Sequence, residues 1–332
     1  MRAFRMEGPG AAAVQEVPDI AAEPGEALLR VKMVGMCGTD LNTFRGRNAM
    51  VTFPRIPGHE VAAEVVEAGG DLAAGTMVTI SPYTSCGRCP SCLRGRVNAC
   101  QFNETMGVQR EGAMIGRVVV PAEKVILVTG LSQRDLALVE PCAVGFHAVR
   151  RAELKSGETV VVLGCGMIGL GVILGALRQG AKVIAIDLSD AKLDVAKKLG
   201  AHETINASTD VKSRVAELTG EGPDVVVEAV GAEATFLQAV DLVATAGRVV
   251  YIGYAKAPIA YETKYFITKE LDIRGSRNAL RSDFDDVIDE LRKRPDAGDL
   301  IVTRTASLDE AAEALADWHA RPGDFTKILV KF

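Results

Sequence analysis

Four cysteines stand close together in this chain, in the pattern C-x2-C-x2-C-x7-C. The segment reads Cys86-Gly-Arg-Cys89-Pro-Ser-Cys92 and continues to Cys100. Four thiolates on so short a loop can converge on one tetrahedral Zn²⁺, and an all-sulfur shell leaves no open position for chemistry. The spacing therefore predicts a structural zinc lobe over residues 86–100. The alternative is a pair of disulfides, which is disfavoured because the N-terminus lacks the apolar segment of a secretory leader.

Size and charge narrow the class of protein. A length of 332 residues suggests about two domains. The net charge is −5, and no run of Lys or Arg offers the basic face that a nucleic-acid partner needs. No membrane span is expected, because glycines interrupt the apolar stretch at residues 160–177. A leaderless chain with seven cysteines indicates a reducing, cytoplasmic location.

The composition and hydrophobic pattern of the chain change near its middle. Residues 1 to about 147 are rich in Gly, Pro and short β-like runs such as 27–34 and 116–120, and no long helix is expected there. From about residue 158, short Val/Ile-rich segments alternate with helical ones. This alternation predicts a doubly wound parallel sheet. The expected strands are residues 159–163, 182–186, 224–228 and 248–252, and the expected helices are residues 167–179, 191–198, 211–218 and 234–244.

The C-terminal tail does not continue this alternation. After residue 283 it has mixed helical character and ends in the strand-like segment 327–332. It cannot extend the parallel sheet without a crossover helix, so we expect it to return to the first domain. The predicted domain bounds are 1–147 with 278–332 for the β-rich domain and 148–277 for the α/β domain.

A nucleotide-binding motif opens the second domain. Gly164, Gly166 and Gly169 form G-x-G-x-x-G between a predicted strand and a predicted helix, and Asp187 ends the next strand. The first glycine permits a tight turn, the second lets the backbone approach a pyrophosphate, and the third lets helix and strand pack closely. A carboxylate at Asp187 would accept both ribose hydroxyls and repel a 2′-phosphate, so the expected cofactor is NAD. Further expected cofactor contacts are Val144, Ile168, Lys192 and Gly253.

Residues able to bind a metal recur beside Gly or Pro in the first domain. They are Cys37 in GMCGTD, His59 and Glu60 in PGHE, and Glu140 in VEP. Cys37, His59 and one or two carboxylates can form a mixed S/N/O shell with an exchangeable water, which is the open geometry of a catalytic zinc. Two zinc ions per chain are therefore expected, one structural and one catalytic.

These motifs, together with VEPCAVGFHA and VLGCGMIGLG, resemble the zinc-dependent medium-chain dehydrogenase/reductase (alcohol dehydrogenase) family over essentially the whole chain. The closest resemblance is to its polyol (sorbitol/xylitol-type) branch and to bacterial sugar-acid dehydrogenases of the galactonate type. The resemblance implies a GroES-like catalytic domain, a Rossmann domain, and a homodimer or homotetramer. It implies that Cys37 and His59 bind zinc, that Glu60 is a direct or switching ligand, and that Glu140 takes the third protein-ligand position.

The same resemblance implies an activity. Hydride passes from a secondary alcohol of a polyol or sugar acid to NAD⁺, giving the keto product, with zinc as a Lewis acid. Thr39 is expected to accept the hydroxyl proton, and Asp40 to hydrogen-bond His59 and fix its tautomer. The family often ends its proton relay in a histidine, but this chain has Asn42 there, so its exit route must differ. His147 is expected to be structural, and Cys142 and Cys165 to serve in packing.

Substrate contacts are expected from two parts of the chain. Arg277 and Asn278 follow a strand-like segment at 270–274, where an arginine can clamp a carboxylate or bond several hydroxyls. Phe44 and Phe102 are expected to line the site. A polar, polyhydroxylated substrate is favoured over a long apolar alcohol.

Other functions stay open on the residues alone. L-threonine or a short-chain alcohol can be the substrate of the same machinery. A zinc-finger-like nucleic-acid binder is disfavoured because the chain has no basic stripe. A catalytically dead NAD sensor is disfavoured because Cys37, His59 and Glu140 are all present.

Overall fold

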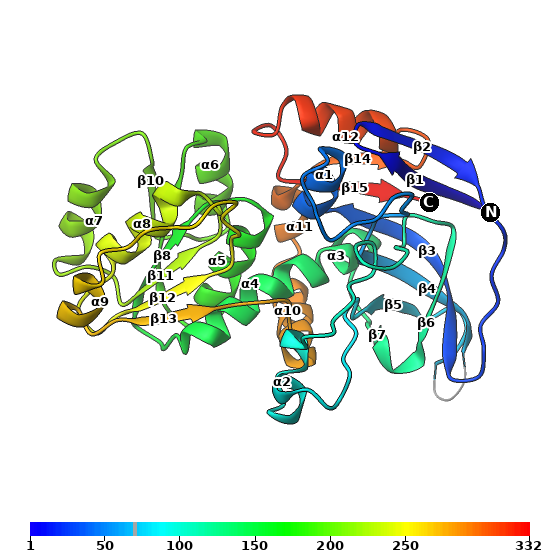
Figure 1. The fold of residues 1–332 in the computed structure, drawn as a ribbon, viewed down its shortest axis with the longest axis horizontal. Helices are drawn as coiled ribbons and strands as arrows, with labels where there is room; N and C mark the ends of the chain where they lie inside the picture. Colours follow the sequence, from blue (N-terminus) through cyan, green and yellow to red (C-terminus); the bar gives the residue numbers. More distant parts are fainter. Residues whose placement is uncertain (69–71) are drawn as a thin grey trace. The chain divides into compact units, whose positions relative to one another are not determined.

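The structure is a computed structural model that describes residues 1–68 and 72–332, and it divides into two compact units (Figure 1). Unit 1 comprises Met1–Glu140 and Leu291–Phe332, and unit 2 comprises Pro141–Glu290. The chain changes unit inside two helices, α4 (Val139–Ala152) and α10 (Arg281–Lys293). The expected α/β two-domain fold class is confirmed.

Unit 2 is a doubly wound parallel sheet. Within the described residues its strand order is β10-β9-β8-β11-β12-β13, and every neighbouring pair is parallel. Numbered along the chain, this order is 3-2-1-4-5-6, the arrangement of a dinucleotide-binding fold. The strands are β8 (Thr159–Leu163), β9 (Lys182–Asp187), β10 (Glu203–Asn206), β11 (Val225–Glu228), β12 (Arg248–Tyr251) and β13 (Asp272–Gly275).

Helices connect these strands. The central strands are buried on both faces, so their Val and Ile side chains form a core with the helices around them. The helices are α5 (Met167–Arg178), α6 (Asp190–Lys198), α7 (Val211–Thr219), α8 (Glu233–Leu242) and α9 (Lys264–Thr268). The expected elements lie within a few residues of those observed, but β10 and α9 were not expected.

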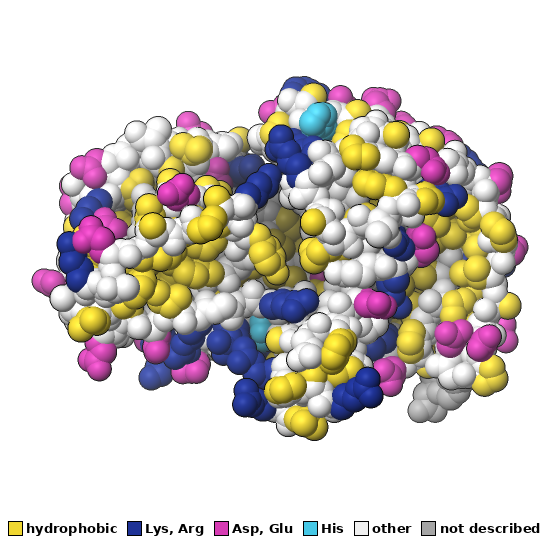
Figure 2. Space-filling view, viewed as in Figure 1, with side chains coloured by type: hydrophobic (Ala, Val, Ile, Leu, Met, Phe, Trp, Pro, Cys, Tyr) yellow, Lys and Arg dark blue, Asp and Glu magenta, His cyan; other side chains and the backbone are white. Residues whose placement is uncertain are grey.

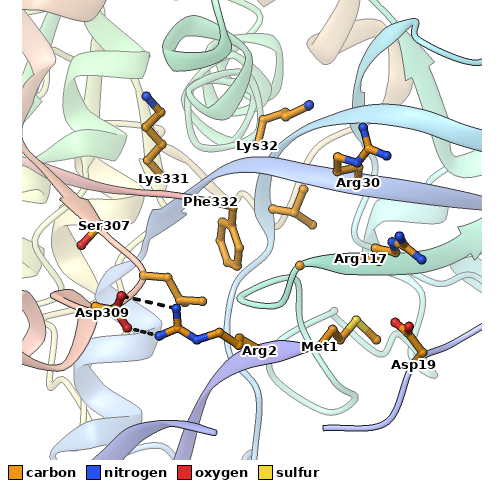
Figure 3. Close-up of a pocket in the computed structure, with 13 residues that line it drawn as sticks. Met1, Arg2, Asp19, Arg30, Lys32, Arg117, Ser307, Asp309, Lys331 and Phe332 are labelled. Carbon is orange, nitrogen blue, oxygen red and sulfur yellow. Dashed lines mark hydrogen bonds and ion pairs between the residues drawn. The ribbon is translucent and has the colours of Figure 1, made fainter. Parts of the chain in front are cut away.

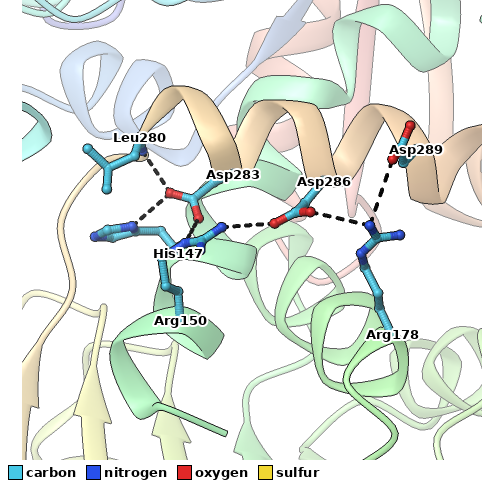
Figure 4. Close-up of polar contacts among 7 residues, drawn as sticks. All are labelled: His147, Arg150, Arg178, Leu280, Asp283, Asp286 and Asp289. Carbon is cyan, nitrogen blue, oxygen red and sulfur yellow. Dashed lines mark hydrogen bonds and ion pairs between the residues drawn. The ribbon is translucent and has the colours of Figure 1, made fainter.

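A charge network, buried at His147 and Asp283 and partly exposed elsewhere, joins helices α4, α5 and α10 of this unit (Figure 4). The Asp283 carboxylate lies 2.8 Å from His147 Nδ1 and accepts hydrogen bonds from Arg150 Nε at 2.6 Å and the Leu280 backbone N–H at 2.8 Å. Asp286 binds both Arg150 and Arg178. His147 is thus the structural histidine that the sequence suggested.

Unit 1 is built on a mixed sheet. The described order is β14-β15-β3-β4-β5-β7. In addition, β6 pairs with the first residues of β3, whereas β15 pairs with its last ones. The C-terminal strand β15 pairs antiparallel with β3, so the chain end joins the sheet of the N-terminal segment. The strands of this sheet are β3 (Glu26–Met36), β4 (Glu60–Ala68), β5 (Met77–Ile80), β6 (Arg117–Pro121), β7 (Val125–Leu127), β14 (Val302–Ser307) and β15 (Lys327–Lys331). A separate two-stranded antiparallel sheet consists of β1 (Arg2–Gly8) and β2 (Ala11–Glu16).

The helical segments of unit 1 are mostly short. They are α1 (Gly38–Phe44), α2 (Pro90–Leu93), η1 (Val97–Ala99), η2 (Ala122–Lys124), α3 (Gln133–Ala137), α11 (Ala297–Ile301) and α12 (Ala311–Ala320). The expectation of no long helix before residue 147 is wrong, because α4 begins at Val139. Pro141 lies in its first turn, where the missing backbone N–H costs nothing. None of the helices in the described ranges is both long and apolar enough to cross a lipid bilayer.

Candidate metal and nucleotide sites

The four cysteines of the lobe converge in space. Their sulfur atoms all lie within 4.8 Å of one another, and all four thiols are free. Cys89 Sγ is 3.5 Å from Cys92 Sγ and 3.8 Å from Cys100 Sγ. Four sulfurs at ~2.3 Å from a tetrahedral zinc would be about 3.8 Å apart, so the cluster has the size of a zinc site. The disulfide alternative does not fit these separations.

The backbone of the lobe is arranged to support thiolates. The N–H groups of Cys89 and Phe102 donate to Cys86 Sγ and Cys100 Sγ at 3.3 and 3.4 Å. The Ser91 side chain and nearby backbone groups lower the pKa of Cys89 to about 5. Hydrogen bonds of this kind favour the charged sulfur that a metal binds.

The outer face of the lobe carries exposed apolar side chains around α2 (Figure 2). Leu93, Val97 and Phe102 are all exposed there. Phe102 is 57% exposed, two residues beyond Cys100. Its expected role in lining a substrate site remains a prediction.

A second cluster brings together Cys37, His59 and Glu60. One ligand atom of each lies within 4.8 Å of the others. Cys37 follows β3 and caps α1, while His59 immediately precedes Glu60, the first residue of β4. Because β3 and β4 pair antiparallel with Gly35 opposite Glu60, the register of two strands places these residues side by side.

Glu60 has a partner that the sequence analysis missed. Lys327, at the start of β15, places Nζ 2.6 Å from both carboxylate oxygens of Glu60 and 2.9 Å from the Met36 carbonyl oxygen. Both side chains are almost fully buried. Gly35 makes room for them, since a Cβ there would lie 1.8 Å from a Glu60 oxygen. A lysine beginning an apolar strand was the only signal in the sequence.

Glu140 lies beside this cluster, but it is not one of the residues whose ligand atoms all lie within 4.8 Å of one another. It is buried on the first turn of α4, and Tyr83 donates its hydroxyl to Oε1. Burial raises the pKa of Glu140, against the lowering effect of His59. Tyr83 is a second residue that the sequence analysis did not identify.

The donor set fits a zinc ion. His59 is buried, and its Nδ1 atom has no hydrogen-bond partner among the described atoms. Burial lowers the pKa of His59, but the neighbouring Cys37 and Glu140 raise it well above its ordinary value. A buried imidazole among a thiol and carboxylates is a place where a cation is stabilised, and S, N and O donors are those that zinc accepts.

Thr39 and Asp40 lie on α1 beside the cluster. Thr39 Oγ1 is 3.6 Å from Cys37 Sγ. The expected hydrogen bond from Asp40 to His59 is not the one observed, because the Asp40 carboxylate accepts from the Cys37 backbone N–H at 2.8 Å. The reason is local: Asp40 is the third residue of α1 and closes its capping box. Asp40 therefore orients Cys37, and its charge still acts on His59.

The glycine-rich turn of unit 2 has the geometry that a dinucleotide needs. Gly164 has φ of 96°, in the left-handed region, and a Cβ at Gly169 would lie 1.8 Å from the Gly164 carbonyl oxygen. A Cβ at Gly166 would meet nothing within 4 Å, so open space lies above the start of α5. A pyrophosphate would fill that space and reach the free N–H groups of the helix.

The end of β9 is hydrogen-bonded to this glycine-rich turn. The Asp187 carboxylate accepts from the Cys165 and Ser189 backbone N–H groups at 2.7 and 2.9 Å. Burial raises the pKa of Cys165 to about 12, so this thiol is inert packing. Lys192 is close enough to act electrostatically on Cys165.

The other expected contacts are spread over both units. Ile168 and Val144 are half-buried, and Gly253 lies against Gly231, which leaves no room for a Cβ. Arg277 is exposed after β13, and Asn278 has φ of 52°. In unit 1, the Phe44 ring packs edge-on against His319, with centroids 5.8 Å apart.

Known proteins resemble the whole chain. The alcohol dehydrogenase GroES-like domain matches residues 23–130, and the zinc-binding dehydrogenase domain matches residues 168–293. A sorbitol dehydrogenase of Halalkalibacterium halodurans is 32% identical over 334 residues, which cover 97% of this chain and 96% of that one. The chain belongs to the zinc-type alcohol dehydrogenase family. It is an enzyme family, and the resemblance inferred from the motifs is confirmed.

Other members of this zinc-type alcohol dehydrogenase family differ in substrate and cofactor. L-galactonate-5-dehydrogenase of Escherichia coli is 35% identical over 264 residues, 78% of each chain. A short chain alcohol dehydrogenase of Escherichia coli CFT073, solved with NADH, superposes with a TM-score of 0.92 at 27% identity, covering 100% and 99% of the two chains. A Sinorhizobium meliloti 1021 protein solved with NADP gives 0.91 at 32% identity, with the same coverage. The expected GroES-like and Rossmann fold is confirmed.

Proposed function

We propose that this protein oxidises a secondary hydroxyl of a polyol or sugar acid, with NAD⁺ as the hydride acceptor and zinc at the Cys37–His59 cluster. The observation that carries the proposal is the buried convergence of Cys37, His59 and Glu60, with Glu140 beside them. Because the remaining ligands are glutamates rather than cysteines or histidines, the donor set is harder and richer in oxygen. Relatives that act on sorbitol and L-galactonate support the choice of substrate class.

The residues of the cluster have separable tasks. Cys37 and His59 would hold the metal, and Glu60 or Glu140 would complete the shell. Zinc bound there supplies a Lewis acid that lowers the pKa of an alcohol, and NAD⁺ supplies the hydride acceptor. Thr39, with Oγ1 beside Cys37 Sγ, would accept the hydroxyl proton. Asn42 cannot pass it on, so the proton must leave through water or a cofactor hydroxyl.

The choice of NAD⁺ rests on Asp187. Its carboxylate sits at the end of β9 with both oxygens held by backbone N–H groups, and a 2′-phosphate brought there would meet a fixed negative charge. Replacing Asp187 by Gly and Leu188 by Arg should weaken NAD⁺ and admit NADP⁺. Leu188→Arg alone is the matched control, since it adds the cation but keeps the repulsion. The assignment fails if the unmodified protein prefers NADP⁺ by about tenfold or more, which corresponds to ~1.4 kcal/mol.

Reduction of NAD⁺ across a panel of substrates tests the activity. The panel contains sorbitol, xylitol, galactonate and idonate. L-threonine and ethanol are included as alternative substrates that the same reaction could oxidise. Turnover should be highest with a polyol or an aldonate and should vanish on metal removal. Highest turnover with L-threonine or ethanol would overturn the substrate class.

A pair of alanine variants links that turnover to the cluster. Cys37→Ala should abolish activity, because it removes a zinc ligand. Cys142→Ala makes the same chemical change at a buried cysteine outside both metal clusters and should retain activity. Equal activity in the two variants would contradict the proposed site.

A further inference from the structure

A hollow of about 580 Å³ opens in unit 1 among strands β3, β6, β14 and β15 (Figure 3). None of the residues in the two metal clusters lines it. Most of its charged lining is basic, from Arg2, Arg30, Lys32, Arg117 and Lys331, and the acidic side chains Asp19 and Asp309 also line it. The phenyl ring of Phe332 stands among these charges, and Val31 and Leu308 add further apolar surface.

The strand register brings like charges together at this hollow. Arg30 and Arg117 are direct partners across the antiparallel pair of β3 and β6. Like charges at such positions destabilise a sheet unless something compensates them. Arg30 and Lys32 lie two residues apart on β3, so they share one face of the strand.

Internal carboxylates compensate only part of this charge. Glu64 on β4 binds both Arg30 at 3.3 Å and Lys32 at 2.8 Å, and Asp309 pairs with Arg2. The hydrogen bond from Lys32 lowers the pKa of Glu64, as expected for a carboxylate in a positive environment. In the described part of the chain, no carboxylate lies within ion-pair distance of Arg117 or Lys331. Two cationic side chains at the hollow are thus left without a partner.

Gly116 keeps part of the hollow empty. Its N–H donates to the Arg2 carbonyl oxygen and its own carbonyl oxygen accepts from the Val31 N–H, each at 3.1 Å, so its backbone links β1 and β3. A Cβ built at Gly116 would meet nothing within 4 Å, and its φ is not in the left-handed region. A larger side chain can therefore occupy this space without backbone strain.

We propose that this hollow binds a small molecule that joins an anionic group to an apolar body, such as an aryl or short acyl phosphate or carboxylate. Arg117, which pairs with Arg30 across strands β3 and β6, supplies the charge complement for the anion. Phe332, Val31 and Leu308 supply the apolar contact. A cation beside apolar surface gives this ligand class an advantage over either half alone.

Calorimetric titration with four probes tests the ligand class. Phenyl phosphate and benzoate carry both features, inorganic phosphate carries only the charge, and benzamide carries only the ring. The two-feature probes should bind at least ten times more tightly than the single-feature probes. Preference for phenyl phosphate over benzoate would identify phosphate esters as the source of the anion, and the reverse would identify carboxylates. Equal affinity of phenyl phosphate and inorganic phosphate would overturn the proposal.

Variants locate the binding. Arg117→Ala should weaken the better probe at least tenfold, and Gly116→Leu should block it by filling the hollow. Lys182→Ala removes the same charge from an exposed position on β9 and should leave binding unchanged. Melting temperatures within a few degrees of the unmodified protein verify folding in each case. Undiminished binding in either hollow variant, or equal loss in the control, would refute the site.

Discussion

At the scale of single residues, the contact between Lys327 and Glu60 is the main addition to the sequence-based account. A lysine buried to 2% exposure within 2.6 Å of two carboxylate oxygens forms a charge pair cut off from solvent. The lysine also bonds the Met36 carbonyl oxygen, just before Cys37. Lys327 therefore fixes the Glu60 carboxylate of the proposed metal cluster and the strand end that precedes Cys37, its proposed thiol ligand.

Removing Lys327 should be costly. Lys327→Met leaves the Glu60 charge buried without its cation, and breaking such a pair typically costs about 3–5 kcal/mol of unfolding free energy. Adding Glu60→Leu should recover a large part of that loss, because the second change removes the stranded charge. Urea unfolding of the two single variants and the double variant measures the coupling. A loss of less than about 1 kcal/mol in Lys327→Met would show that water solvates the pair.

Glu140 tests the make-up of the metal shell. Glu140→Ala should lower kcat/KM at least about 100-fold, or ~2.7 kcal/mol, while NAD⁺ affinity and folding persist. Tyr83→Phe keeps the carboxylate and removes only its hydrogen bond, so it should cost clearly less. Near-normal turnover with full zinc occupancy in Glu140→Ala would make Glu140 a bystander and leave the shell to Glu60 or water.

At the scale of helices and strands, the network around Asp283 contributes to the stability of unit 2. It ties α10 to α4 and α5 through residues more than a hundred positions apart in sequence. Burial opposes ionisation of Asp283, but hydrogen bonds from His147 and Arg150 prevail and lower its pKa. A folded pKa below that of the unfolded chain means that the ionised carboxylate stabilises the fold above about pH 4.

Asp283→Asn should remove this stabilisation, at a cost of about 1.5–3 kcal/mol at neutral pH. The difference in unfolding free energy between the variant and the unmodified protein should shrink as pH falls through the folded pKa of Asp283. The carboxylate of the unmodified protein is then protonated, and both proteins carry a neutral side chain at this position. Chemical unfolding at pH 7, 5 and 3 measures this difference. Asp285→Asn, exposed on the same helix, is the control and should stay within about 0.5 kcal/mol. A gap that is constant with pH would contradict the role of the charge.

Local spacing explains which elements were predictable. The four-cysteine lobe and the turn from Gly164 to Gly169 each lie within one short segment. The spacing of their residues therefore predicts both the local structure and the chemistry of the site. The start of α4 was missed because Pro141 lies in its first turn, and a proline at a helix start resembles a turn.

Long-range contacts were not predictable from one sequence. Lys327 meets Glu60 only because β15 inserts beside β3, and 267 residues separate the two. Asp40 was assigned to His59 by family resemblance, whereas the local capping of α1 takes its carboxylate. Register and capping decide such partners, and neither is visible in residue spacing.

At the scale of the whole molecule, the two metal clusters of unit 1 should behave differently. The cluster of Cys86, Cys89, Cys92 and Cys100 is closed by four sulfurs with backbone N–H support. The Cys37 cluster mixes donor types and, in the proposed function, would keep a position open for substrate, so a metal held there should exchange faster. Two zinc ions per chain are therefore expected, with unequal lability.

Stepwise chelation measures this difference. Dialysis against a mild chelator should remove about one zinc per chain together with all activity, while circular dichroism and the urea midpoint change little. A stronger, thiol-competing chelator should then take the second zinc and unfold the lobe, because a structural zinc contributes directly to folding. Cys92→Ser is the matched variant: it should lose the tightly held ion first and retain the labile one. Full activity with one zinc per chain, or simultaneous loss of both ions with unfolding, would contradict two sites of distinct function.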